Sequence, residues 1–296
     1  LSPSSAASDV YKRQFLSRIG FVILAAGDLI FAYAATGTLL AIPVTAVLLL
    51  IGIAILFFLA LLNLQARPLS QCRSMDANRL LRNFAIVKQK LQNSGGHCPN
   101  IKLYISRSPS RNAFSLGNHI IFTEGMMQES DMVLQAVIVH ELGHTLHYDS
   151  YFSSLLQCNL FCFTGLFLLS QFGVLLFVGV LLFFVFCIAF GGFAAMAITG
   201  LFTKIVRGFC NLFLKLAIML HNLFAALLFR QQEYAADALT VPLGCSTAMK
   251  YFLEDLEQSE PVQLNFTEQL LSDHPSNYAR IAKLEQAEAA QTTQIV

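Results

Sequence analysis

The 296-residue sequence contains no tryptophan, and only 12% of its residues carry a charged side chain. The 19 Lys and Arg residues nearly balance the 18 Asp and Glu residues, and a formal net charge of +1 gives no basic field that would attract nucleic acid. Apolar residues make up 55% of the chain, 26 residues are Phe, and the mean hydropathy is +0.60. Such a composition is untypical of a soluble enzyme, and we expect much of the apolar surface to lie in lipid.

The sequence also lacks a cysteine framework. Its seven cysteines include no C-x-x-C pair, and an odd number without regular spacing is typical of a reducing compartment. An initiator Met is absent as well, and residues 4–14 (SSAASDVYKRQ) resemble one translated frame of a sequencing-library adaptor. We therefore interpret residues 1–14 as an assembly scar and leave them out of the fold prediction.

Two long uncharged tracts dominate the rest of the chain. Residues 29–66 contain no charged side chain, and Asp28 separates this tract from the apolar residues 19–27. Residues 150–203 contain no Asp, Glu, Lys, Arg or His. A hydrocarbon core of about 30 Å requires about 20 helical residues, so each tract has room for a hairpin of two spans. We place the spans near residues 19–40, 44–64, 154–171 and 174–200, with the second turn at 171–173 and Gly191-Gly192 as the alternative.

The cations indicate how these hairpins are oriented. Arg18, Arg67 and Arg73 flank the first hairpin, and Lys204 and Arg207 follow the second, whereas neither turn contains Lys or Arg. Because positive charge favours the cytoplasmic side, we expect every hydrophilic segment to lie in the cytoplasm.

The hydrophilic segments show helical and strand patterns. Residues 76–93 indicate an amphipathic helix, 101–105 a strand, and 112–116 with 119–123 a β-hairpin. Ser130 is a candidate N-cap for a helix that ends near residue 147, and further helices are expected at 204–239, 247–258 and 277–290. The fold class is therefore a mainly α membrane protein with about four transmembrane helices and a cytoplasmic α+β domain. Its expected parts are an N-terminal hairpin (15–66), the first part of the cytoplasmic domain (67–149), the second hairpin (150–203) and the second part of that domain (204–296).

The expected helix after Ser130 contains the motif HELGH at residues 140–144. Residues four apart share one helix face, so His140 and His144 can bind one Zn²⁺, with Glu141 beside the fourth ligand position. Zinc lowers the pKa of a bound water to about 7, and a neighbouring carboxylate can accept its proton during attack on a peptide carbonyl. The pattern indicates a metalloprotease.

A catalytic zinc of this kind requires a third protein ligand, and Glu233 is our candidate. Asp237 lies one helical turn later on the same face, where it can accept a hydrogen bond from the free nitrogen of a ligating His. The expected topology supports the assignment. An even number of membrane crossings separates His144 from Glu233, so both return to the same side.

Four segments together resemble the HtpX family of membrane-embedded zinc metalloproteases, which is related to the CAAX prenyl proteases. They are SPSRNAFSLG (108–117), HELGHTLHYD (140–149), RQQEYAAD (230–237) and DHPSNYARIAKL (273–284), in the family's order. The resemblance implies that the cytoplasmic domain is zincin-like (a gluzincin). It also implies one Zn²⁺ per chain held by His140, His144 and Glu233, with Glu141 as general base and acid.

The resemblance further implies supporting roles for five residues. Asn112 and Ala113 would lie on an edge strand whose backbone aligns the substrate by β-addition. His274 would either donate to the oxyanion of the tetrahedral intermediate or remain a loop residue. Arg280 would support the site or the structure, and Asp149 would cap the zinc helix or pair with an arginine.

The leading hypothesis is a zinc endopeptidase of the bacterial inner membrane that cuts misfolded or damaged membrane proteins at their cytosolic segments. Its partners would be protein substrates and the lipid bilayer, with no nucleic acid. One alternative is a site-two-type intramembrane protease, which would bury the motif inside a span, but Asp131 and Asp149 bracket the expected helix. Another is a non-catalytic scaffold with a structural zinc, which would favour four protein ligands and would have no use for Glu141.

Overall fold

The computed structural model describes residues 41–63, 66–259 and 274–295, with a few single positions between 19 and 33. The predicted scar at 1–14 and most of the predicted span at 19–40 lie outside the described residues. The chain divides into two compact units. The first unit draws mainly on residues 53–154 and 225–296, and the second on residues 20–52 and 155–224.

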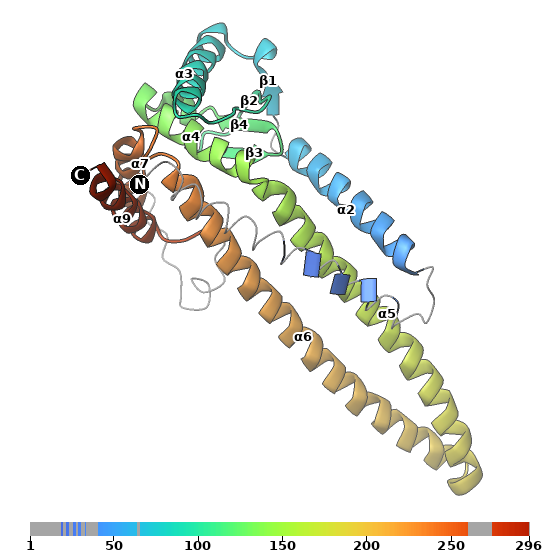
Figure 1. Ribbon diagram of the computed structural model, residues 1–296. Coiled ribbons are helices and arrows are strands. Elements are labelled where there is room, and N and C mark those ends of the chain that lie inside the picture. The colour runs from blue at the N-terminus through green and yellow to red at the C-terminus, as the bar shows by residue number, and fades with distance from the viewer. Residues whose placement is uncertain are drawn as a thin grey trace. The chain divides into compact units, whose positions relative to one another are not determined.

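A small mixed sheet forms one layer of the first unit (Figure 1). Its strand order is β1-β2-β4-β3, in which β2 and β4 are parallel and the other two pairings are antiparallel. Among the described strands β3 pairs only with β4, so its other edge is free of strand partners. The strands are β1 (Ala66–Pro68), β2 (Lys102–Ser106), β3 (Ala113–Leu116) and β4 (His119–Thr123).

Helices cover this sheet and complete the core of the first unit. Helix α4 packs against α3, α7 and β3. Fully buried side chains come from each layer, including Leu80, Phe122, Ile138 and Leu253. The helical elements are α3 (Ser74–Asn93), α4 (Asp131–His147), α7 (Ser246–Ser259) and α9 (Asn277–Ile295), with the short 3-10 helices η1 (Leu69–Gln71) and η2 (Met126–Gln128).

The elements predicted for this unit are confirmed within one or two residues for most boundaries. Ser130 is the N-cap of α4, because its hydroxyl accepts a hydrogen bond from the backbone N–H of Val133. The C-terminal helix is longer than predicted, ending at Ile295 instead of residue 290. Strand β1 was not predicted, since three residues, one of them Pro68, carry no recognisable alternation.

The second unit contains long apolar helices. Helix α2 covers Ala41–Asn63, α5 covers Asp149–Phe190 and α6 covers Gly192–Ala238, and the last two are long and apolar enough to cross a membrane. With 42 and 47 residues, α5 and α6 are about 60–70 Å long, which is about twice the thickness of a hydrocarbon core. All three helices contain a boundary between the units, which falls after residue 52 in α2, after residue 154 in α5 and after residue 224 in α6.

The structure corrects the position of the second hairpin turn. The preferred site at residues 171–173 is wrong, because α5 runs through it without a break. The alternative is correct: the chain reverses at Gly191, whose φ of +81° is a left-handed conformation that glycine adopts without steric cost. The helix predicted to start at residue 204 is likewise the continuation of α6, since no Gly-Gly or Pro interrupts the chain there.

Candidate metal centre

Three side chains of the first unit converge at one point. His140 and His144 extend from α4, and Glu233 comes from the last turns of α6. The two Nε2 atoms are 3.1 Å apart. The Glu233 carboxylate completes the triangle, with Oε2 3.6 Å from the Nε2 of His140 and Oε1 3.5 Å from the Nε2 of His144. This cluster could hold a metal ion.

The spacing of the donor atoms fits a tetrahedral zinc ion. Zinc binds imidazole nitrogen and carboxylate oxygen at about 2.0–2.2 Å, so two ligand atoms of a tetrahedron lie about 3.3–3.5 Å apart. The three observed separations, 3.1, 3.5 and 3.6 Å, surround this value. Two imidazoles and one carboxylate also match the ligand set of a catalytic site, which leaves the fourth position open.

Carboxylates hold both imidazoles in the orientation that metal binding needs. The Nδ1 of His140 lies 2.8 Å from Asp237, and the Nδ1 of His144 lies 2.8 Å from Asp149. A hydrogen bond donated by Nδ1 leaves Nε2 as the free lone pair, directed at the cluster. Asp237 thus has the contact predicted for it. Asp149 also lies behind a candidate ligand, but in the described part of the chain it forms no ion pair with an arginine, and α4 ends at Tyr148 in a left-handed conformation.

Arg280, on α9, packs against the carboxylates of Asp237 and Glu233, and only 11% of its side chain is exposed. Its guanidinium donates to both oxygens of Asp237, at 2.7 and 2.8 Å, and its Nη1 lies 3.2 Å from Glu233. Burial alone would raise the pKa of these carboxyl groups, but Arg280 lowers the pKa of Asp237 to about 2 and helps to lower that of Glu233 well below its ordinary value. Both carboxylates are therefore ionised at neutral pH, as a cation site requires.

The carboxylates of Asp149 and Glu233 act on His144. Burial would lower the pKa of this imidazole, but the hydrogen bonds with Asp149 and Glu233 raise it well above its ordinary value. The cluster thus carries enough negative charge to stabilise a cation between the imidazoles. A metal ion and a proton compete for the same nitrogen.

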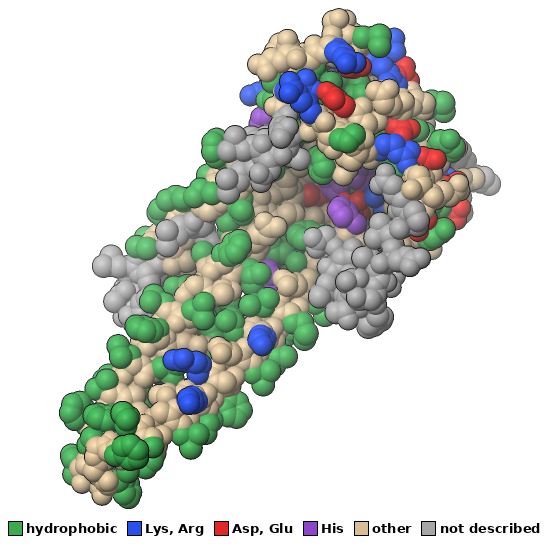
Figure 2. Space-filling model, turned by 180° about the vertical axis from the view of Figure 1, so that it is seen from behind, with side chains coloured by type: hydrophobic (Ala, Val, Ile, Leu, Met, Phe, Trp, Pro, Cys, Tyr) green, Lys and Arg blue, Asp and Glu red, His purple; other side chains and the backbone are tan. Residues whose placement is uncertain are grey.

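The two predicted catalytic residues lie at the cluster. Glu141 follows His140 on α4, and its side chain is buried, with its charge acting on His144 and Arg280. The Nδ1 of His274 lies 3.2 Å from Glu233 while 75% of its side chain is exposed. His274 therefore reaches the cluster from the solvent side, and Figure 2 shows histidine side chains in a hollow of this face among acidic and basic ones.

The predicted substrate-aligning residues lie at the free edge of the sheet. Asn112 immediately precedes β3, and Ala113 is its first residue, paired with Phe122 of β4. The residue that holds this segment, Thr123, was not among the predicted site residues. The buried Thr123 hydroxyl accepts from the backbone N–H of Asn112 at 3.0 Å and donates to the carbonyl of Asn112 at 2.7 Å. A threonine at the end of a strand carries no signal that would have revealed this role.

Gly143 is a second residue whose role was missed. A Cβ atom at this position would lie 2.9 Å from the Cα of Ala236 on α6, which is closer than side chains approach a backbone. The glycine thus allows α4 to approach the α6 segment that carries Glu233. The motif contains this residue, but nothing in the sequence says which helix it faces.

We expect Gly143→Ala to weaken zinc binding at least about tenfold and to lower the unfolding temperature, because overpacking at a backbone contact costs about 1–3 kcal/mol. Zinc titration and thermal unfolding in detergent measure the two effects. Gly165→Ala is the matched control, since a Cβ there meets nothing within 4 Å. Equal zinc affinity in both variants would show that the close approach does not position Glu233.

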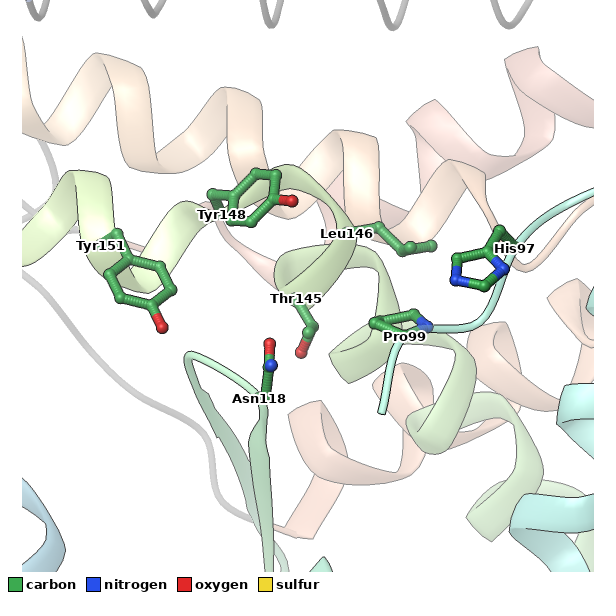
Figure 3. A pocket seen from close by; sticks show the side chains of 7 residues that line it. All are labelled: His97, Pro99, Asn118, Thr145, Leu146, Tyr148 and Tyr151. Carbon is green, nitrogen blue, oxygen red and sulfur yellow. The ribbon is translucent and has the colours of Figure 1, made fainter. Parts of the chain in front are cut away.

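A separate cavity of about 430 Å³ lies at the C-terminal end of α4 (Figure 3). In Figure 3, Thr145 lies beside Asn118, and both face the space between Tyr151 and Pro99. None of the three candidate ligands lines this cavity, so it is not the metal centre. Its lining residues are His97, Pro99, Asn118, Thr145, Leu146, Tyr148 and Tyr151.

Two histidines on one helix, a distant glutamate and carboxylates behind the imidazoles define a metallopeptidase-like site. Comparison with protein families agrees: the model of peptidase family M48 matches residues 77–288, which include all of these residues. The chain belongs to peptidase family M48, and the predicted relationship to HtpX-type metalloproteases is confirmed at this level.

The crystal structure of S. mikatae Ste24p is similar, with 18% sequence identity and a TM-score of 0.48. The match covers 93% of this chain, and the chain spans 66% of the length of that protein. The comparison with curated proteins found no match.

Proposed function

We propose that this protein is a membrane-embedded zinc endopeptidase. The observation that carries the proposal is the convergence of His140, His144 and Glu233 at ligand spacing, with a carboxylate behind each imidazole. These three residues would hold one Zn²⁺ per chain. When bound, the ion supplies Lewis acidity, which lowers the pKa of a water molecule and polarises the peptide carbonyl.

Glu141 would perform the proton transfers. Its buried carboxylate follows a candidate ligand in the chain but is not a member of the cluster, so it is free to accept a proton from the attacking water. The same carboxyl group would then protonate the leaving amine. Arg280 and Asp237 would orient the imidazole of His140 and keep Glu233 ionised, and both act through other residues without touching the substrate.

The substrate would bind as an extended strand. The free edge of β3 offers backbone hydrogen bonds to such a peptide, starting at Asn112 and Ala113. Pairing along a strand edge contacts the substrate backbone and does not require a free end of the substrate chain. This mode of binding favours cleavage of internal peptide bonds. His274 would donate a hydrogen bond to the oxyanion, a role supported by its exposed position beside Glu233.

The apolar helices support a location in a membrane. Exposed large side chains cover α5 and α6, and Lys204 and Arg207 support a cytoplasmic position for the hydrophilic parts. We propose misfolded or damaged membrane proteins as substrates and a bacterial inner membrane as the site. The intramembrane and scaffold alternatives are not favoured, because the motif precedes α5 in the chain and the third donor is a glutamate in a three-residue cluster.

Metal removal tests the proposed function. We expect a chelator to abolish cleavage of casein by the detergent-solubilised protein, and one equivalent of Zn²⁺ per chain to restore it. A metal-independent serine protease assayed in parallel controls for effects of the chelator on casein. Cleavage that persists after zinc has been removed would contradict the proposal.

A further inference from the structure

Helices α5 and α6 carry positive charge without an acidic residue over most of their length. Residues 150–232 contain no Asp or Glu, whereas α6 carries Lys204, Arg207 and Lys215 within this interval. Among the residues that the structure describes, no ion pair involves any of these three. Unpaired cations are unfavourable on an apolar surface unless a solvent or a ligand stabilises them.

These cations lie on one face of α6. At 3.6 residues per turn, four exposed polar residues fall within an arc of about 80°, and we call them the basic stripe: Lys204, Arg207, Asn211 and Lys215. Exposed apolar side chains such as Phe209 and Leu212 cover the neighbouring faces. Figure 2 shows Lys and Arg side chains on this helix hairpin surrounded by hydrophobic ones.

Helix α5 packs elsewhere on α6. The rings of Phe167 and Phe213 lie 5.5 Å apart, and a Cβ at Gly179 would lie 3.6 Å from the Thr203 side chain. In helical projection Phe213 is about 160° and Thr203 about 80° from the centre of the basic stripe, so the contacts with α5 lie to one side of it, with Arg207 as the stripe residue nearest to them. All four residues of the stripe are exposed in the part of the chain that the structure describes, so they are accessible to a partner.

The position of the basic stripe along α6 coincides with one boundary of a bilayer. Along α6, Lys204 is about 20 Å and Lys215 about 36 Å beyond Gly191. The exposed Phe190 and Phe193 make the hairpin tip apolar. With this tip at one boundary of a hydrocarbon core of about 30 Å, the stripe straddles the other, where long cationic side chains extend into the headgroup layer.

We propose that the basic stripe binds the headgroups of anionic phospholipids. Arg207 can form two hydrogen bonds with one phosphate, and the lysines act as point charges beside it. Negative lipid is the partner that combines the required charge with the apolar surroundings of the stripe. The proposal rests on the membrane location in the proposed function and does not depend on peptidase activity.

Electron spin resonance of reconstituted protein tests the proposal. The full chain is placed in phosphatidylcholine bilayers with a trace of spin-labelled phosphatidylglycerol or phosphatidylcholine, and the protein-bound fraction of each label is compared. One cation near an anionic surface contributes about fivefold, so we expect a preference for phosphatidylglycerol of at least about fivefold that weakens at high salt. K204Q/R207Q/K215Q should lower this preference to near unity.

Two further variants make the result specific. R73Q/K88Q/K102Q removes the same charge from exposed positions of the first unit and should keep the preference. K204R/K215R conserves the charge and should also keep the preference for phosphatidylglycerol. This variant tests the role of charge even if the triple glutamine variant misfolds. Equal binding of both labels by the parent protein, or an unchanged preference in K204Q/R207Q/K215Q, would overturn the proposal. Glu141→Gln should keep the preference for phosphatidylglycerol, which separates lipid binding from the peptidase proposal.

Discussion

Glu141→Gln is expected to lower kcat/KM for peptide cleavage by about 10³-fold while the protein still binds one zinc per chain. The carboxamide has nearly the same size as the carboxylate but cannot accept the proton of the attacking water, a transfer that contributes about 10²–10⁴-fold. Zinc binding should persist because Glu141 does not belong to the ligand cluster. The measurements are the initial rate of peptide hydrolysis in detergent and the zinc content of the same preparation.

Glu285→Gln is a suitable control for this prediction, because Glu285 is an exposed acid on α9. The control should keep both activity and zinc. Full activity of the Glu141→Gln protein would exclude Glu141 as the general base. Loss of zinc together with activity would assign Glu141 a structural role, in which its charge stabilises His144 and Arg280.

Glu233→Ala is expected to lower zinc affinity by at least about 100-fold. The substitution removes one of three ligands and leaves Arg280 facing Asp237 alone, so the remaining pair of imidazoles must hold the ion without a neutralising ligand. Zinc titration against a competing chelator measures the change. A Glu233→Ala protein that holds zinc as tightly as the parent would exclude Glu233 as the third ligand.

Local features of the sequence predicted the local part of the site. The spacing of His140 and His144 places them on one helix face whatever the rest of the fold does, and Ser130 marks the start of that helix. Strands β2, β3 and β4 follow from alternation and from the Gly117-Asn118 turn. These predictions depend only on interactions between residues that are close in sequence, so the local sequence is sufficient to make them.

Contacts between distant segments could be predicted only in part. Asp237 followed from helical spacing to Glu233, but the pairing of Arg280 with both carboxylates depends on how α9 folds back over α6. Asp149 reaches His144 because Tyr148 adopts a φ of +61°. Tyrosine rarely adopts this left-handed conformation, and no sequence pattern predicts it here. Both Gly173 and Gly191 were candidates for the turn, and the helix ends at the Gly191-Gly192 pair, whose first residue adopts a φ of +81°, and not at the single Gly173.

The stoichiometry of zinc in the intact, detergent-extracted protein tests most directly whether α4 and α6 hold one ion together. After exposure to excess zinc and removal of the unbound metal, elemental analysis should find about one zinc per chain in the parent and almost none in H140A/H144A. Absence of stoichiometric zinc from the parent, or its full retention by H140A/H144A, would contradict the assignment of the site.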